Sequence, residues 1–171
     1  SGGALAERMR IDGSGNVGIG TSTVGSGGSN TQNVHIHNST ANSTYLKLST
    51  SGTGATASDG LDLIMGNDGT GYLWNRENAS TIFATNNTER MRIDSNGHLI
   101  PGASNTYDLG SQAKPWKDLY IGDLKLSNET REEGNDIDGT KGNWTIQEGE
   151  SNLYIINNNN GKKYRFALEE V

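Results

Sequence analysis

Two histidines separated by one residue, His35 and His37, are the side chains best suited to metal chemistry in this sequence. Alternate residues of a β-strand point to one face, so both imidazoles share a face if residues 33–37 form a strand. With that face on a threefold axis, three copies of the chain bring six imidazoles together, a set suited to octahedral iron or nickel. Val34 and Ile36 occupy the opposite face and compete for burial, which favours an exposed histidine pair instead.

Two groups of carboxylates invite comparison with hydrolytic and calcium sites. A glycoside hydrolase needs two carboxyl groups about 5–10 Å apart in a sugar-binding cleft, and the spacing of Asp59, Asp62 and Asp68 gives no support for one. We interpret these three as turn residues. Residues 136–139, Asp-Ile-Asp-Gly, lack the twelve-residue pattern and the later glutamate of a calcium loop, which indicates a charged surface loop. The chain is therefore predicted not to be an enzyme.

Three aromatic residues near the C-terminus, Trp144, Tyr154 and Tyr164, are candidate receptor or glycan contacts. Aromatic rings that face outward among polar neighbours are a common way for proteins to hold sugars. Three aromatic side chains in a small domain also commonly form its core. The sequence leaves both interpretations open.

The charge of the chain limits its partners. The formal net charge is -6, and the one basic cluster is Lys162, Lys163 and Arg165. Phosphate binding requires a basic stripe, so we expect no nucleic-acid partner. We interpret the basic cluster as the solvated edge of a sheet, where lysine discourages unwanted pairing. No apolar run reaches 18 residues, so no membrane insertion is expected, and the lack of cysteine excludes disulfides and thiolate metal sites.

The composition indicates that one copy of the chain cannot build its own core. Leu, Ile, Val and Phe make up 31 of 171 residues, or 18%, below the roughly 20% typical of chains with a proper core. Gly, Asn, Ser and Thr make up 76 residues, or 44%. Ordering each residue costs about 1–2 kcal/mol of backbone entropy, which so little apolar area does not offset. Because the strand-like patterns argue against disorder, we expect several copies to share one core.

One string occurs twice, at residues 7–12 and 89–94, where the sequence reads Glu-Arg-Met-Arg-Ile-Asp. Met and Ile alternate with charged residues in each copy, the period of a half-buried strand. Each copy is followed by a polar glycine-containing turn and by a second short apolar run, at residues 17–19 and 98–100. We therefore predict a β-hairpin at each copy.

The rest of the chain also predicts short strands and no long helix. Glycine, asparagine and serine separate strand candidates at residues 33–37, 45–48, 60–65, 71–75 and 81–85. Residues 144–147, 153–156 and 164–168 predict a three-stranded antiparallel meander. The one place suited to a helical turn begins at Ser111, before Pro115.

Residues 7–21 resemble the recurrent shaft module of bacteriophage tail fibres. Residues 72–78 and 83–90 resemble the same module. Trp74 and Trp116 lie within strings that resemble tail-fibre sequences, and we predict that both are core residues. The strings at residues 99–102, 107–110 and 116–120 are similar to the junction before the C-terminal part of these fibres. Residues 142–171 resemble a fibre tip, and no Ser/Lys pair of a self-cleaving chaperone is evident in residues 122–171.

The resemblance implies a homotrimer in which the three chains share one apolar seam and leave no free sheet edges. It also raises the expectation of iron or nickel at His35 and His37, because some phage fibres use His-x-His motifs this way. Since the chain starts at Ser1-Gly2-Gly3 without methionine, we expect it to be a fragment, joined to other tail proteins through a missing N-terminal part.

The sequence thus predicts an all-β, elongated homotrimeric fibre with intertwined or stacked strands. Residues 1–22 are expected to end a shaft repeat, 23–104 to form a β-rich shaft or head module, 105–141 a junction, and 142–171 a β-meander tip. The expected function is virion attachment to a host cell-surface polysaccharide or outer-membrane protein, as a trimer. A polysaccharide-depolymerising tailspike and a pure trimerisation module are the alternatives.

Overall fold

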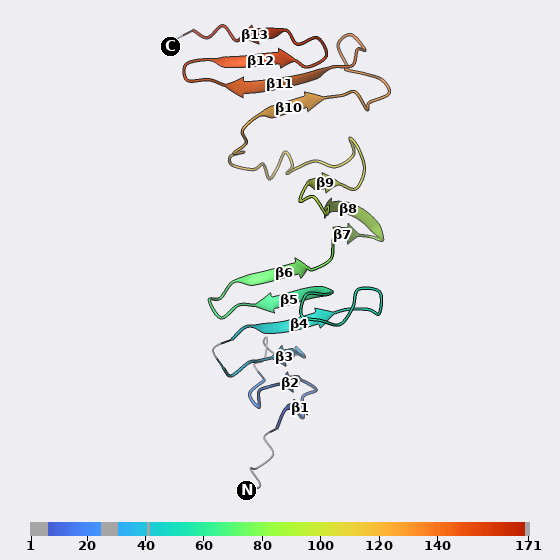
Figure 1. Cartoon of the computed structure of the whole chain (residues 1–171), viewed down its shortest axis with the longest axis vertical. Helices are drawn as coiled ribbons and strands as arrows, with labels where there is room; N and C mark the ends of the chain where they lie inside the picture. The colour runs from blue at the N-terminus through green and yellow to red at the C-terminus, as the bar shows by residue number, and fades with distance from the viewer. Residues whose placement is uncertain (1–6, 25–30, 41, 170–171) are drawn as a thin grey trace. The chain divides into compact units, whose positions relative to one another are not determined.

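Every regular element of the computed structural model is a β-strand, within the residues that it describes, 7–24, 31–40 and 42–169. Thirteen strands follow one another along the described residues (Figure 1). They are β1 (Met9–Ile11), β2 (Val17–Ile19), β3 (Val34–Ile36), β4 (Thr44–Leu48), β5 (Leu61–Met65), β6 (Gly71–Asn75), β7 (Thr81–Thr85), β8 (Thr88–Ile93), β9 (Leu99–Pro101), β10 (Leu124–Ser127), β11 (Asn143–Glu148), β12 (Leu153–Asn157) and β13 (Lys163–Arg165). The all-β class is confirmed, and a search of these residues found no helix long and apolar enough to cross a membrane.

The strands form four small sheets, in the orders β1-β2-β3, β4-β5-β6, β7-β8-β9 and β10-β11-β12-β13. The registered pairings are antiparallel, apart from β2 and β3, which run parallel. The chain divides into two compact units, Ser1–Thr81 with Ile93–His98, and Ile82–Arg92 with Leu99–Val171.

The repeated string builds the same turn twice. In the first copy Asp12 Oδ1 accepts hydrogen bonds from backbone amides two and four residues later, at 2.8 and 2.9 Å. In the second copy Asp94 Oδ1 accepts the same two bonds, both at 2.9 Å. Gly15 and Gly97 take φ angles of +84° and +86°, which residues with a side chain rarely adopt. Strands β1 and β2 and strands β8 and β9 are neighbours, so both predicted hairpins are confirmed.

The β4-β5-β6 sheet separates its side chains by chemistry. Strand register places Leu46, Leu63 and Leu73 opposite one another on one face. Leu48 and Met65 share that face by alternation, and we call these five residues the aliphatic face. The other face carries the polar and aromatic side chains together with Ile64. Alternation therefore gives this sheet one mainly aliphatic surface, with Thr44 and Asn75 in its outer rows.

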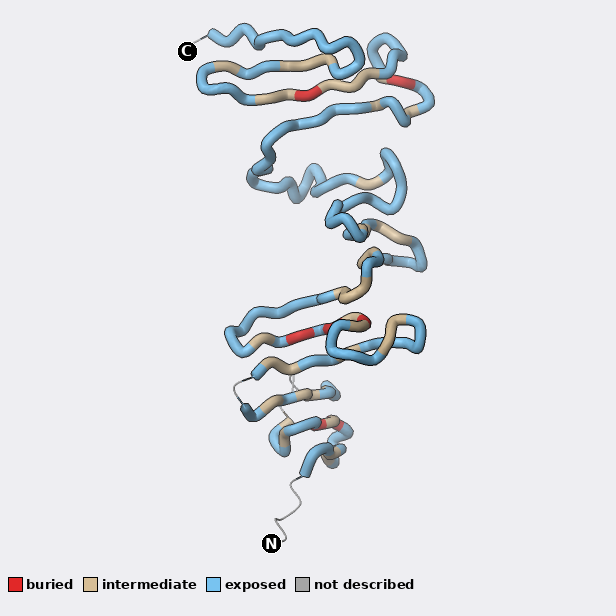
Figure 2. Tube along the Cα trace, in the orientation of Figure 1, coloured by how far each residue is buried: buried red, intermediate tan, exposed pale blue. Residues whose placement is uncertain are grey.

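A single copy of the chain buries very little apolar surface. Among the described residues, Ile64 is the one large apolar side chain classed as buried, at 6% exposed. Figure 2 shows how few buried positions lie along the trace. Leu46, Leu63 and Leu73 of the aliphatic face are 46%, 57% and 53% exposed. The core that folding normally supplies is thus missing from one copy, as the composition predicts.

The C-terminal sheet is larger than the predicted meander. Strands β11 and β12 occupy the predicted positions, β13 is shorter than the predicted 164–168 and ends at Arg165, and β10 pairs with β11 as a fourth strand. The predicted helical turn is wrong. Ser111 and Lys114 instead exchange two backbone hydrogen bonds, at 3.1 and 3.2 Å, as a β-bridge. A reversal of four residues closes these bonds without a helical turn.

Candidate functional site

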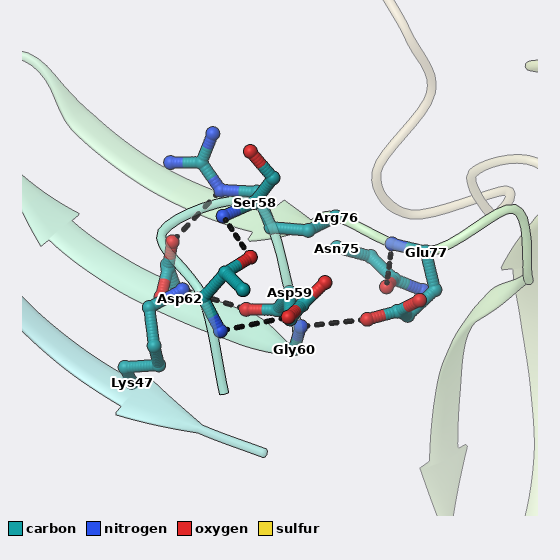
Figure 3. Close-up of polar contacts among 9 residues, drawn as sticks. Lys47, Ser58, Asp59, Gly60, Asp62, Asn75, Arg76 and Glu77 are labelled. Carbon is teal, nitrogen blue, oxygen red and sulfur yellow. Dashed lines mark hydrogen bonds and ion pairs between the residues drawn. The ribbon is translucent and has the colours of Figure 1, made fainter. Parts of the chain in front are cut away.

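A buried carboxylate, Asp62, lies at the centre of a polar cluster on the β4-β5-β6 sheet (Figure 3). Cross-strand pairing places Lys47 and Trp74 on either side of it. Lys47 Nζ lies 2.9 Å from Asp62 Oδ1, an ionic contact without the alignment of a hydrogen bond. Arg76 Nε donates a 2.9 Å hydrogen bond to Asp62 Oδ2. Two cations thus compensate a side chain that is 0% exposed.

The loop between β4 and β5 is tied to this cluster. Lys47 Nζ donates a 2.6 Å hydrogen bond to the Asp59 carbonyl, and the Gly60 amide donates one of 2.7 Å to Glu77 Oε1 (Figure 3). Gly60 has a φ of +82°, and a Cβ atom there would lie 2.3 Å from the Leu48 carbonyl oxygen. Only glycine fits this close approach, so the loop reaches the sheet at one defined point.

The three carboxylates do not resemble a hydrolytic pair. The contact with the Lys47 ammonium lowers the pKa of Asp62, against an opposing effect of burial and with further help from Arg76. Hydrogen bonds from backbone amides lower the pKa of Asp59 and of Asp68. A general acid for glycoside cleavage needs a raised pKa. The turn interpretation of Asp62 is wrong, because this residue lies within β5 and faces two cations.

We expect the protein to lose stability in acid because of these carboxylates. The folded-state pKa of Asp62 lies below its unfolded value of about 3.9, so its contribution is present above that pH. The contribution disappears as the pH falls through the folded pKa. The same direction holds for Asp12, Asp59, Asp68, Asp94 and Asp138. Circular dichroism melts from pH 7 to pH 2 should show a Tm that drops below about pH 4, and a Tm that rises there would contradict the pairing.

His35 and His37 lie on the same side of the chain, as the spacing predicts, with ring centroids 5.8 Å apart. His35 Nδ1 is buried and has no hydrogen-bond partner among the described residues. A search of these residues found no group of three or more side chains able to hold a metal. One copy therefore supplies two imidazoles, and an iron or nickel site at this pair stays a prediction that depends on further copies.

The C-terminal sheet does not bring the three predicted aromatic residues into one site. Trp144 and Tyr164 share one face, with ring centroids 6.1 Å apart, and lie with Leu126 and Ile146. Tyr154 lies on the opposite face, because it pairs with Gln147 and not with Ile146. Trp144 and Tyr164 thus belong to an apolar surface, while Tyr154 faces polar neighbours.

The polar face of this sheet also holds part of the basic cluster. Lys163 and Arg165 alternate with Tyr164 on β13, and Arg165 is the cross-strand neighbour of Tyr154. Strand β13 is the last of its sheet, so the predicted edge position of these cations is confirmed.

The Asp-Ile-Asp-Gly run forms a self-contained loop. Asp138 Oδ1 accepts hydrogen bonds from the Thr140 hydroxyl at 2.7 Å, the Thr140 amide at 3.0 Å and Asn135 Nδ2 at 2.5 Å. The hydrogen bond from the Thr140 hydroxyl is the main cause of the lowered pKa of Asp138. The carboxylate thus closes its own turn, in agreement with the surface-loop interpretation.

Comparison of the chain with protein-family models, with curated proteins and with solved structures found no match. The function is therefore argued from the residues and their geometry.

Proposed function

We propose that the chain is a distal part of a homotrimeric bacteriophage tail fibre, which attaches the virion to a host-cell receptor without chemical change. The observation that carries this proposal is the aliphatic face of the β4-β5-β6 sheet. Its five side chains are 46–59% exposed in the single chain, although they form one continuous surface. Exposed apolar surfaces of this kind are characteristic of interfaces.

A second uncovered apolar surface supports a shared core. Leu124, Leu126, Ile146, Ile155 and Tyr164 alternate onto one face of the β10-β13 sheet. Leu124, Leu126 and Tyr164 are each exposed in the single chain. Around a threefold axis, three copies of each sheet cover one another's apolar faces and form the core that one copy lacks.

The tail-fibre assignment rests on the resemblance of the repeated strings. Each repeated string ends in the Asp-anchored hairpin turn described above, so the recurring residues have a structural purpose. A recurrent strand-and-turn module suits a shaft that holds a binding tip away from the virion. Other tail proteins are the proposed partners at the opposite end.

The adhesive function follows from symmetry. Three identical binding surfaces on one axis increase the total affinity, because each further contact forms at a high effective concentration. The proposed receptor is a cell-surface polysaccharide or an outer-membrane protein. The ion pairs of Asp62 argue against the depolymerase alternative, because both carboxylate oxygens contact cations of the chain itself.

A pure assembly module is the second candidate, and one observation favours it. Trp144 and Tyr164 lie on the apolar face of the tip sheet, where contact with other copies hides them from a receptor. If the isolated trimer binds no bacterial cells while it keeps its mass, the assembly module is the better description. Binding to cells supports the adhesion proposal.

Light scattering tests the trimer directly. We expect a solution mass of about three times the chain mass of 18.3 kDa, unchanged by dilution in the micromolar range. A mass of one chain would contradict the proposal, because the apolar faces would then stay open to water.

A further inference from the structure

The face of the β4-β5-β6 sheet opposite the aliphatic face carries exposed aromatic rings. Tyr72 and Trp74 alternate onto this face of β6, and their ring centroids lie 6.0 Å apart. Tyr45 of β4 occupies the same cross-strand row as Tyr72, with Ile64 between them. The three rings are 50% (Tyr45), 36% (Tyr72) and 47% (Trp74) exposed, and we call them the aromatic face. The prediction that Trp74 is a core residue is therefore not met within one copy.

The Trp74 ring is held in place by the buried carboxylate. The guanidinium carbon of Arg76 lies 4.4 Å from the centroid of the Trp74 ring. Arg76 Nε is fixed by its 2.9 Å hydrogen bond to Asp62 (Figure 3). The two Nη atoms of Arg76 have no partner among the described residues and are available to a ligand. The cluster thus positions a ring and a pair of hydrogen-bond donors side by side.

The two faces of this sheet differ in the desolvation free energy that an interface with another copy would require. Covering the aliphatic face removes mainly apolar surface and no charged side chain from water. Covering the aromatic face would also remove Lys47 and Arg76 from water, whose side chains are 30% and 22% exposed. The aliphatic face is therefore the one that other copies cover, and the aromatic face remains in solvent.

We infer that the aromatic face binds a neutral glycan chain. The apolar faces of hexose rings stack on aromatic side chains, and the sugar hydroxyls accept hydrogen bonds from Arg76. The charges beside the rings largely cancel, because Lys47 and Arg76 both contact the Asp62 carboxylate and the Asp59 carboxylate also feels the charge of Lys47. An acidic glycan gains little electrostatic attraction at this face, whereas a neutral glycan needs none in order to bind. This inference rests on the proposed function and names its ligand class and its site.

Affinity electrophoresis of the full chain tests the inference. Native gels are prepared with neutral polymers, namely dextran, yeast mannan and laminarin, and with alginate as the acidic polymer. We expect at least one neutral polymer to retard the protein, and Trp74→Ala to weaken that binding about tenfold or more. Trp116→Ala removes another exposed indole, from outside this sheet, and should bind as the unsubstituted chain does.

Three results would overturn the inference. They are no retardation by any neutral polymer, retardation by alginate alone, and unchanged binding by Trp74→Ala. Light scattering is run on each variant, and Tyr72→Ala replaces Trp74→Ala if the latter loses its assembly. If both variants lose assembly, the aromatic face is an interface between copies and the inference is wrong. If the protein is a trimer but binds no neutral glycan, only this inference is wrong and the proposed function is not contradicted. If the protein is a monomer, the proposed function is contradicted whatever the protein binds.

Discussion

Leu63→Asp is expected to convert the proposed trimer into single chains. Leu63 lies in the middle strand of the aliphatic face, between Leu46 and Leu73, so three copies would each bury a carboxylate in the shared core. An unpaired buried charge costs several kcal/mol, which weakens association on the order of 100-fold or more. Light scattering should show the mass fall from three chains to one at micromolar concentration.

Two matched variants separate assembly from other effects of this substitution. Leu63→Met keeps volume and apolar character, and we expect it to remain trimeric. Asn67→Asp adds the same charge in the exposed turn between β5 and β6 and should also leave the mass unchanged. A trimeric Leu63→Asp variant would show that the aliphatic face is not the interface. Loss of assembly by Leu63→Met would point to general sensitivity of β5.

Local structure was predictable wherever the sequence alternates between apolar and polar residues. Both hairpins and strands β3 to β7 lie where the pattern places them, because strand period and turn chemistry act over few residues. Strand β10 was missed, although Leu124 and Leu126 alternate with polar residues. It is short and precedes a long charged stretch, so its pairing with β11 depends on a contact distant in sequence.

The functional residues were harder to predict, because strand register decides which face of a sheet each side chain occupies. Trp144, Tyr154 and Tyr164 lie on three strands, and the turns on either side of β12 decide which face each side chain takes. Asp62 looked like a turn residue because Lys47 and Arg76 lie 15 and 14 residues away from it. The alternation of residues 61–65 was the available signal, since it placed an acidic residue within a strand.

Asp62→Asn is expected to destabilise the β4-β5-β6 sheet strongly. The substitution keeps the shape of the side chain but removes its charge, which leaves Lys47 and Arg76 without their shared counter-ion. Removing one partner of a buried ion pair lowers the stability of the fold, because the charges that remain are desolvated and unpaired. We expect the Tm at neutral pH and fixed chain concentration to fall by about 10 °C. Asp68→Asn makes the same exchange in an exposed turn and should change the Tm by only a few degrees.

The pH dependence of the two proteins makes this test specific to charge. Protonation of Asp62 in acid removes the same charge as the substitution, so the Tm values of the unsubstituted protein and of Asp62→Asn should approach each other as the pH falls below the unfolded pKa of about 3.9 toward the lowered folded pKa. Their difference should be largest above pH 5, where the carboxylate is ionised in both folded and unfolded chains. A constant difference from pH 7 to pH 2 would mean that the substitution acts through changed hydrogen bonding and not through charge. Since Arg76 also orients Trp74, loss of glycan retardation by folded Asp62→Asn would link the buried carboxylate to the aromatic face.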